Sequence, residues 1–236
     1  MSWAADTLAL YARVFQRAAT LTARNPTLVV AVMVYAMVLQ LALGLAATLL
    51  AAGPLAILAG FVWLAALAAC FGSWLALTER VVTDGRTTPS ELPASFRPYV
   101  VDVLVVGMLI GFLRMIAAIV LAPFPFLQIV FGLATVVFFN AAPELIYLGR
   151  HTPIELLAAS YTFVAQNWIE WFPPTVLLFV LVVAVAVVTP AGPFGLVAAA
   201  AVGLVASYAW VVRGLLFVEL TTSSRRAREF QRRAAR

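Results

Sequence analysis

Three charged residues interrupt long apolar runs of this chain: Arg114, Glu144 and Arg213. A charge inside such a run is costly unless it is paired or hydrated, so these residues are the first candidates for chemistry. An arginine there can bind an anion or a lipid headgroup, and a carboxylate can pair with an arginine or relay a proton.

Arg114 lies 15 residues after Tyr99, where its apolar run begins. On a helix that distance is about 22 Å, past the middle of a bilayer. Gly107 and Gly111 share its helical face, and this small-residue pattern predicts packing against another helix. Polar residues expected at a similar depth on other runs are its candidate partners: Gln40, Thr135, Ser207 and Tyr208.

Two interpretations of Arg114 stay open. It could form an anion or lipid-headgroup site in a cavity between helices. It could instead be a structural arginine, satisfied by buried side chains and carbonyls or directed toward the bilayer surface.

Glu144 and Arg213 fall about one to two helical turns inside the same end of their runs, so we expect an ion pair between them. A structural clamp is favoured over a proton relay.

Other chemistry lacks a residue set. His151 is the only histidine and Cys70 the only cysteine, so we expect no metal site, no catalytic constellation and no cofactor. All 15 basic residues are arginines at a net charge of +5, but most stand at the ends of apolar runs, which argues against nucleic-acid binding. A group near the C-terminus could hold anionic lipid headgroups, at about 1 kcal/mol each, or only fix topology: Arg225, Arg226, Arg228, Arg232, Arg233 and Arg236.

The elements that must position these residues are membrane helices. The chain has 236 residues, of which 64% are hydrophobic and 11% charged, and a mean hydropathy of +1.05, which predicts an all-α polytopic membrane protein. Each apolar run has roughly the 20 residues that a spanning helix needs. Six spans, paired as three hairpins, are predicted at 27–50, 55–78, 99–121, 126–148, 171–189 and 194–218.

Two amphipathic segments accompany the domain of residues 27–218, one before it and one within it. Residues 1–26 predict an interfacial helix with Leu10 and Val14 on its apolar stripe, and residues 153–168 predict a second, elbow helix. Residues 219–236 form a basic tail.

Two octads resemble each other at six of eight positions, 64 residues apart: residues 85–92 and 149–156. In each, Thr precedes Pro and a Glu follows, so Thr88 and Thr152 should cap helices that begin at Pro89 and Pro153. A weaker similarity links the segments before the first and fifth spans. Together these features predict an internal repeat of three related units.

The arginines are distributed unevenly between the two sides. We call the polar connections that contain the octads 85–92 and 149–156 the first and second elbows. Of the 15 arginines, 13 lie before the first span, in these elbows or in the tail, whereas the short turns at 51–54, 122–125 and 190–193 carry no charge. By the positive-inside rule, both termini and both elbows are cytoplasmic. We expect a multi-pass protein of a prokaryotic cytoplasmic (inner) membrane.

Three local patterns resemble a known membrane family: Arg24-Asn25-Pro26, Thr83-Asp84-Gly85-Arg86, and Ala158-Ala159-Ser160-Tyr161 leading to Gln166-Asn167-Trp168. They are similar to the six-helix membrane domain found beside some glycerophosphodiester phosphodiesterases, and to stand-alone prokaryotic membrane proteins of the same type. No residue with catalytic meaning is among them, so the resemblance implies the membrane architecture and no activity.

The leading functional hypothesis is a non-enzymatic scaffold, partner subunit or lipid-associating module. Its expected partners are membrane lipids with anionic headgroups at the cytoplasmic face, a protein partner or a second copy of the chain. The alternative is a small transporter or channel for an anionic or lipid-like substrate, and an intramembrane enzyme comes third. A hydrated cavity reaching Arg114 would favour transport, and a filled bundle would favour the scaffold.

Overall fold

The computed structural model describes residues 3–51, 53, 56–149, 152–188 and 195–222. The six tail arginines, His151 and the turn at 190–193 lie outside these residues. Within them the chain is helical and contains no strand, which confirms the all-α prediction. The elements are α1 (Trp3–Arg24), α2 (Pro26–Ala51), α3 (Ala56–Thr83), the 3-10 helix η2 (Pro89–Glu91), α4 (Leu92–Ser95), α5 (Val100–Val120), α6 (Pro125–Phe138), α7 (Ala142–Leu148), α8 (Pro153–Val188) and α9 (Gly195–Thr222).

Six helical stretches are long and apolar enough to cross a membrane, as the sequence predicts. The fourth stretch is not one helix, however. It is divided into α6 and α7 around residues 139–141, because Pro143 has no N–H to continue the backbone ladder.

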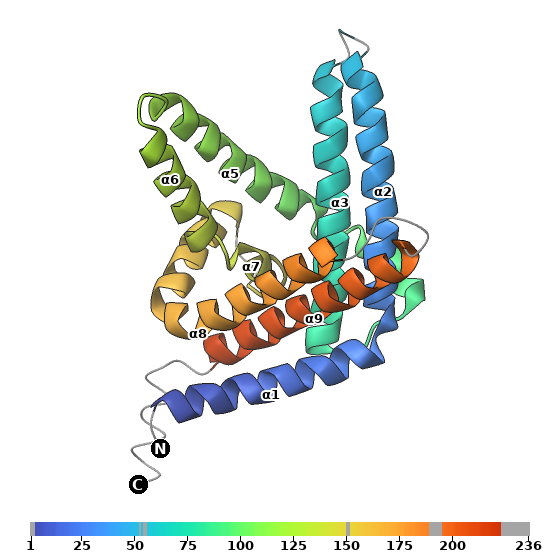
Figure 1. Cartoon of the computed structure of the whole chain (residues 1–236), viewed down its shortest axis with the longest axis vertical. Helices are drawn as coiled ribbons and strands as arrows, with labels where there is room; N and C mark the ends of the chain where they lie inside the picture. Colours follow the sequence, from blue (N-terminus) through green and yellow to red (C-terminus); the bar gives the residue numbers. More distant parts are fainter. Residues whose placement is uncertain (1–2, 52, 54–55, 150–151, 189–194, 223–236) are drawn as a thin grey trace.

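The prediction of a separate elbow helix at 153–168 followed by a span at 171–189 is wrong. Both belong to the continuous helix α8, which contains Pro173 and Pro174. Figure 1 shows that α8 changes direction between its yellow first part and its orange second part. A proline pair inside a helix removes two backbone bonds, so it bends the helix here rather than ending it.

The helices do not form one parallel bundle. Figure 1 shows α2 and α3 side by side and the α5–α6 hairpin inclined away from them, with the connected ends of both hairpins at the top. Helix α9 crosses the lower part of the α2–α3 hairpin, the second part of α8 packs along α9, and α1 lies beneath α9.

Helix α9 is the centre of the packing. It contacts α1, α2, α3, α7 and α8. Of the residues in its most apolar stretch 50% are buried, against 6% in that of α5. The hydrophobic core therefore surrounds α9, and the α5–α6 hairpin is the least enclosed part of the molecule.

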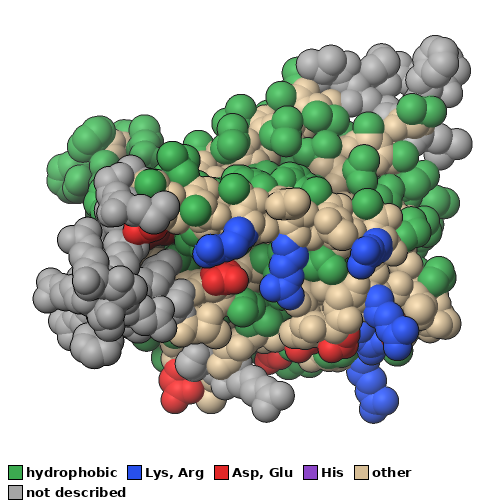
Figure 2. Space-filling model, turned by 90° about the horizontal axis from the view of Figure 1, so that it is seen from below, with side chains coloured by type: hydrophobic (Ala, Val, Ile, Leu, Met, Phe, Trp, Pro, Cys, Tyr) green, Lys and Arg blue, Asp and Glu red, His purple; other side chains and the backbone are tan. Residues whose placement is uncertain are grey.

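The apolar stripe of α1 is covered by protein. Leu10, Val14 and Ala18 are buried, whereas Arg13 and Arg17 on the opposite face are exposed. Figure 2, seen from below, shows arginine side chains spread along this lower face. The sequence indicated a membrane surface as the partner of this stripe, but helical periodicity cannot distinguish lipid from α9 as the apolar neighbour.

Candidate functional site

The interruption of the fourth span creates a polar site inside the molecule. Between α6 and α7 the backbone turns at residues 139–141, which leaves the Asn140 carbonyl available to a partner. The Arg213 Nη2 of α9 donates to this oxygen at 2.7 Å, and its Nη1 donates to the Asn140 Oδ1 at 3.1 Å. Arginine thus replaces the helix ladder at the point where it is broken.

The predicted pair between Arg213 and Glu144 forms at the same place. Arg213 Nε lies 2.7 Å from Glu144 Oε1, and Nη2 lies 2.9 Å from Oε2, so the contact is bidentate. The Glu144 side chain is fully buried and that of Arg213 is 13% exposed. Parallel N–H···O bonds of this kind fix orientation as well as charge.

Two tryptophans complete this cluster. The guanidinium carbon of Arg213 lies 5.0 Å from the ring centre of Trp171 and 5.3 Å from that of Trp210. Trp171 Nε1 also donates to Asn140 Oδ1 at 2.9 Å. We call Asn140, Glu144, Trp171, Trp210 and Arg213 the arginine clamp.

The arginine clamp joins α7, α8 and α9, and its charges are engaged with one another. That arrangement suits a structural role better than a proton relay, because the bidentate contact and the two tryptophans hold both side chains in one fixed arrangement. Sequence analysis missed Asn140, Trp171 and Trp210. The available signal was Pro143 within a predicted span, which marks a break whose freed backbone groups need partners.

Arg114 has a different environment from Arg213. Among the described residues it has no hydrogen-bond or ion-pair partner, and its side chain is exposed. It lines a cleft of about 370 Å³ between α5 and α6 with Gly111, Gln128 and Gly132 among its neighbours. We call this hollow the Arg114 cleft.

The partners predicted for Arg114 are engaged elsewhere. The hydroxyls of Thr135 and Ser207 donate to carbonyls of their own helices at 2.8 and 2.6 Å. Tyr208 donates to the Phe15 carbonyl at 3.4 Å, and Gln40 is exposed on α2. The prediction fails because a helical hydroxyl satisfies itself on the preceding turn, so equal depth does not imply contact.

The predicted helix packing at Gly107 and Gly111 is also wrong within the described chain. A methyl group added to either glycine would meet no atom within 4 Å. Both residues are exposed, and Gly111 lines the open Arg114 cleft instead of packing against α6.

An apolar groove lies next to the Arg114 cleft. It has a volume of about 480 Å³, runs between the α5–α6 hairpin and α8, and shares the Phe131 side chain with the cleft. Its lining is Leu113, Phe131, Ala134, Thr135, Phe138, Phe139, Leu157, Ala158, Tyr161 and Thr162.

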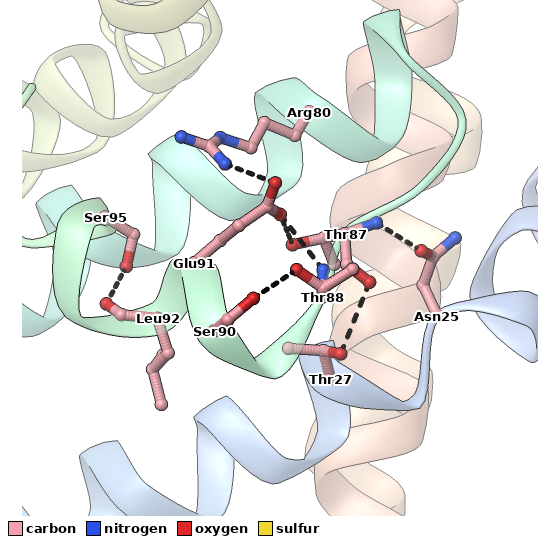
Figure 3. A network of polar contacts seen from close by, with 9 residues as sticks. All are labelled: Asn25, Thr27, Arg80, Thr87, Thr88, Ser90, Glu91, Leu92 and Ser95. Atoms are coloured by element: carbon pink, nitrogen blue, oxygen red, sulfur yellow. Dashed lines mark hydrogen bonds and ion pairs between the residues drawn. The ribbon is translucent and has the colours of Figure 1, made fainter.

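The first elbow is held by Asn25, at the start of the first span. Its Oδ1 accepts from the Thr87 backbone N–H at 2.7 Å, and its Nδ2 donates to the carbonyls of Leu21 and Gly85 at 2.7 and 3.2 Å. Figure 3 shows Asn25 facing Thr87 across this junction. Gly85 has a φ of +75°, which glycine adopts without a side-chain penalty. Two of the patterns behind the family resemblance therefore meet in space.

Both octads begin helical structure at proline, as predicted. Glu91 Oε2 accepts from the Thr88 N–H at 3.0 Å, and Glu155 Oε2 accepts from the Thr152 N–H at 3.2 Å. The Thr88 N–H is the main cause that lowers the pKa of Glu91 from its ordinary value, and Arg80, 2.7 Å away, adds to it. The first helix is only the short η2–α4 segment, whereas the second continues as α8.

Helix α1 is attached to the bend of α8. Pro173 and Pro174 leave the carbonyls four residues earlier, those of Ile169 and Glu170, without helix donors. The Tyr11 hydroxyl donates to the Glu170 carbonyl at 2.9 Å and lies 3.5 Å from that of Ile169. Burial, and then the charge of Glu170, raise the pKa of Tyr11 to about 12, so it remains a donor at neutral pH.

Comparison of the chain with models of known protein families, with curated proteins and with solved structures finds no match. The resemblance to the phosphodiesterase-associated membrane domain therefore stays a prediction that rests on the residues quoted above.

Proposed function

We propose that this integral membrane protein is a non-enzymatic scaffold that associates with lipids, in a prokaryotic cytoplasmic membrane with both termini in the cytoplasm. The observation that carries the proposal is the α5–α6 hairpin. It leaves the helices around α9, exposes apolar side chains along both of its helices and bears an arginine that has no partner among the described residues.

The different surroundings of the two arginines within the spans, Arg213 and Arg114, support this proposal. Arg213 neutralises a buried carboxylate and completes a broken backbone, which is a structural task. Arg114 has no such task in the described chain, yet its charge in a membrane segment requires an anion or water. In a bilayer, anionic headgroups are the most abundant source of such an anion.

A transporter for an anionic or lipid-like substrate is the second candidate, and the Arg114 cleft is the observation that favours it. The cleft is confined to the space between α5 and α6, whereas alternating access requires a site between two bundles that move against each other. The scaffold is therefore the better supported of the two.

Purification of the protein with its native lipids tests the proposal. We expect anionic phospholipids to be enriched over the surrounding membrane, together with any stably bound protein. A retained lipid mixture identical to that of the membrane would refute lipid association. Uptake of labelled inorganic phosphate or phosphatidylglycerol by proteoliposomes, above that of empty vesicles, would establish the transporter instead.

A further inference from the structure

We infer that the α5–α6 hairpin holds one anionic phospholipid, with its phosphate against Arg114 and an acyl chain in the apolar groove beside α8. The inference rests on the proposed function and assigns its site and ligand class. It is carried by two adjoining hollows of opposite character, the Arg114 cleft and the apolar groove.

The Arg114 cleft provides hydrogen-bond donors for a phosphate. Arginine matches phosphate with two parallel N–H groups, and Arg114 has both to offer, since no described residue accepts from it. Gln128 uses one amide N–H on the Ala118 carbonyl, at 3.4 Å, and keeps another. Gly111 and Gly132 leave the cleft open, because a methyl group on either would meet no atom within 4 Å.

Among the described residues, no carboxylate forms an ion pair with Arg114. The acidic residue nearest to it in sequence is Asp102, 12 residues earlier on α5, about 18 Å along the helix. Glu144 is already paired in the arginine clamp, and Glu170 lies at the bend of α8, where α1 is attached. Within the described part of the chain Arg114 therefore has no counter-ion, and we assign that role to the lipid phosphate.

The apolar groove favours an occupant that is largely apolar. The hydroxyls of its two threonines, Thr135 and Thr162, donate to the carbonyls of Phe131 and Ala158 at 2.8 and 2.9 Å. Apart from the Tyr161 hydroxyl, what remains on the lining is aliphatic and aromatic surface, which gains from apolar contact. An acyl chain satisfies this condition.

The depths of the two hollows match the two parts of a lipid. Arg114 and Gln128 lie 6 and 3 residues from the ends of α5 and α6 that meet at the turn, about 9 and 5 Å along the helices. The groove continues along α6 to Phe138, which lies 13 residues from Pro125, about 20 Å along α6. A leaflet of hydrocarbon is about 15 Å thick. The phosphate thus lies near the bilayer surface on the side of the turn, and the acyl chain below it.

Lipid binding by purified variants tests this assignment. We would measure retention of phosphatidylglycerol and phosphatidylcholine by native mass spectrometry, with inorganic phosphate and glycerol 3-phosphate as ligands that lack an acyl chain. The variants are Arg114→Met, which removes the charge, Arg114→Lys, which keeps it, and Ala134→Trp, which fills the groove. Arg17→Met on the exposed face of α1 is the matched control, and monodisperse elution verifies folding.

We expect the wild type to bind one phosphatidylglycerol per chain in preference to phosphatidylcholine. Arg114→Met should weaken the binding of phosphatidylglycerol at least about tenfold and abolish the preference over phosphatidylcholine, and Arg114→Lys should restore part of both. Ala134→Trp should weaken the binding of both lipids, and Arg17→Met should change the binding of neither. Inorganic phosphate and glycerol 3-phosphate, which lack an acyl chain, should bind far more weakly than phosphatidylglycerol.

Three results would overturn the assignment. If the wild type prefers phosphatidylglycerol and Arg114→Met retains that preference, the protein binds lipid elsewhere, and the site fails while the proposed function stands. If the wild type shows no preference for anionic lipid, the proposed function fails with it. If Arg114→Met converts a dimer into a monomer and leaves lipid binding unchanged, the cleft is a contact between copies.

Discussion

Replacement of Arg213 by methionine tests whether the arginine clamp is a structural unit. The substitution keeps the length of the side chain near the backbone but removes the guanidinium, so three contacts are lost together: the bidentate bond to Glu144, the bonds to Asn140 and the stacking on Trp171 and Trp210. Glu144, which is fully buried, is left as an unpaired carboxylate.

The size of the effect follows from that stranded charge. Removing one partner of a buried ion pair costs about 3–5 kcal/mol, whereas replacing both partners by apolar residues is often close to neutral. The double variant Glu144→Met with Arg213→Met still leaves the Asn140 carbonyl without a donor, a cost of about 1–3 kcal/mol. The double variant should therefore be more stable than Arg213→Met alone.

Glu144→Met alone should cost less than Arg213→Met. The arginine keeps its bonds to Asn140 and its contact with both tryptophans, and its side chain is 13% exposed, so it remains partly compensated. Arg80→Met is the matched control, because Arg80 pairs with Glu91 at the same 2.7 Å with both side chains 35% exposed. Exposed pairs contribute only about 0.2–1 kcal/mol.

Thermal unfolding in detergent, at one scan rate, measures all four variants. For a chain of this length 1 kcal/mol corresponds to about 2–4 °C, so Arg213→Met should lower the Tm by about 6–20 °C and Arg80→Met by no more than about 4 °C. Equal shifts for Arg213→Met and Arg80→Met, or single effects that simply add in the double variant, would refute the clamp.

Three further predictions follow from the structure. Tyr11→Phe removes the donor to the Glu170 carbonyl and should lower the free energy of unfolding by about 1–3 kcal/mol. Because the native pKa of Tyr11 is raised to about 12, the contribution of this hydroxyl should be complete below pH 10 and lost as the pH rises toward 12. A stability profile at alkaline pH that is the same in the wild type and in Tyr11→Phe would contradict this prediction. Asn25→Ala breaks three hydrogen bonds at the first elbow and should lower the free energy of unfolding by about 2–3 kcal/mol, whereas Thr20→Val on exposed α1 should change it little. A phosphatase that works only outside the cytoplasm should be inactive when fused after Arg236 and active in the turn at 122–125; the reverse pattern would invert the topology.

The sequence predicted those features that depend on composition along one helix. Apolar runs of sufficient length identify the six spans, and the cost of a charge in such a run identifies Glu144 and Arg213 as partners. The start of both elbow helices at Pro89 and Pro153 follows from local capping chemistry, which needs only neighbouring residues.

The features that failed depend on the direction in which a side chain points relative to other helices. The sequence predicts similar depths in the membrane for Arg114 and Thr135, but two residues at one depth can face different neighbours. The rotation of each helix about its axis depends on packing, which hydrophobic periodicity does not specify. For the same reason the sequence did not predict the hydrogen bond of Tyr11 to the carbonyls left free by Pro173 and Pro174, although the proline pair itself can be read from the sequence.

The contrast between Arg213 and Arg114 indicates where function should be sought in this fold. Both are arginines within membrane spans, and by sequence alone they carry the same cost. Around Arg213 the chain provides a carboxylate, a carbonyl, an amide oxygen and two aromatic faces, so nothing is left for a ligand. Around Arg114 it provides a cleft and no acceptor among the described residues. A charge that the fold does not satisfy requires something outside the chain, and the α5–α6 hairpin is where that requirement is exposed to the bilayer.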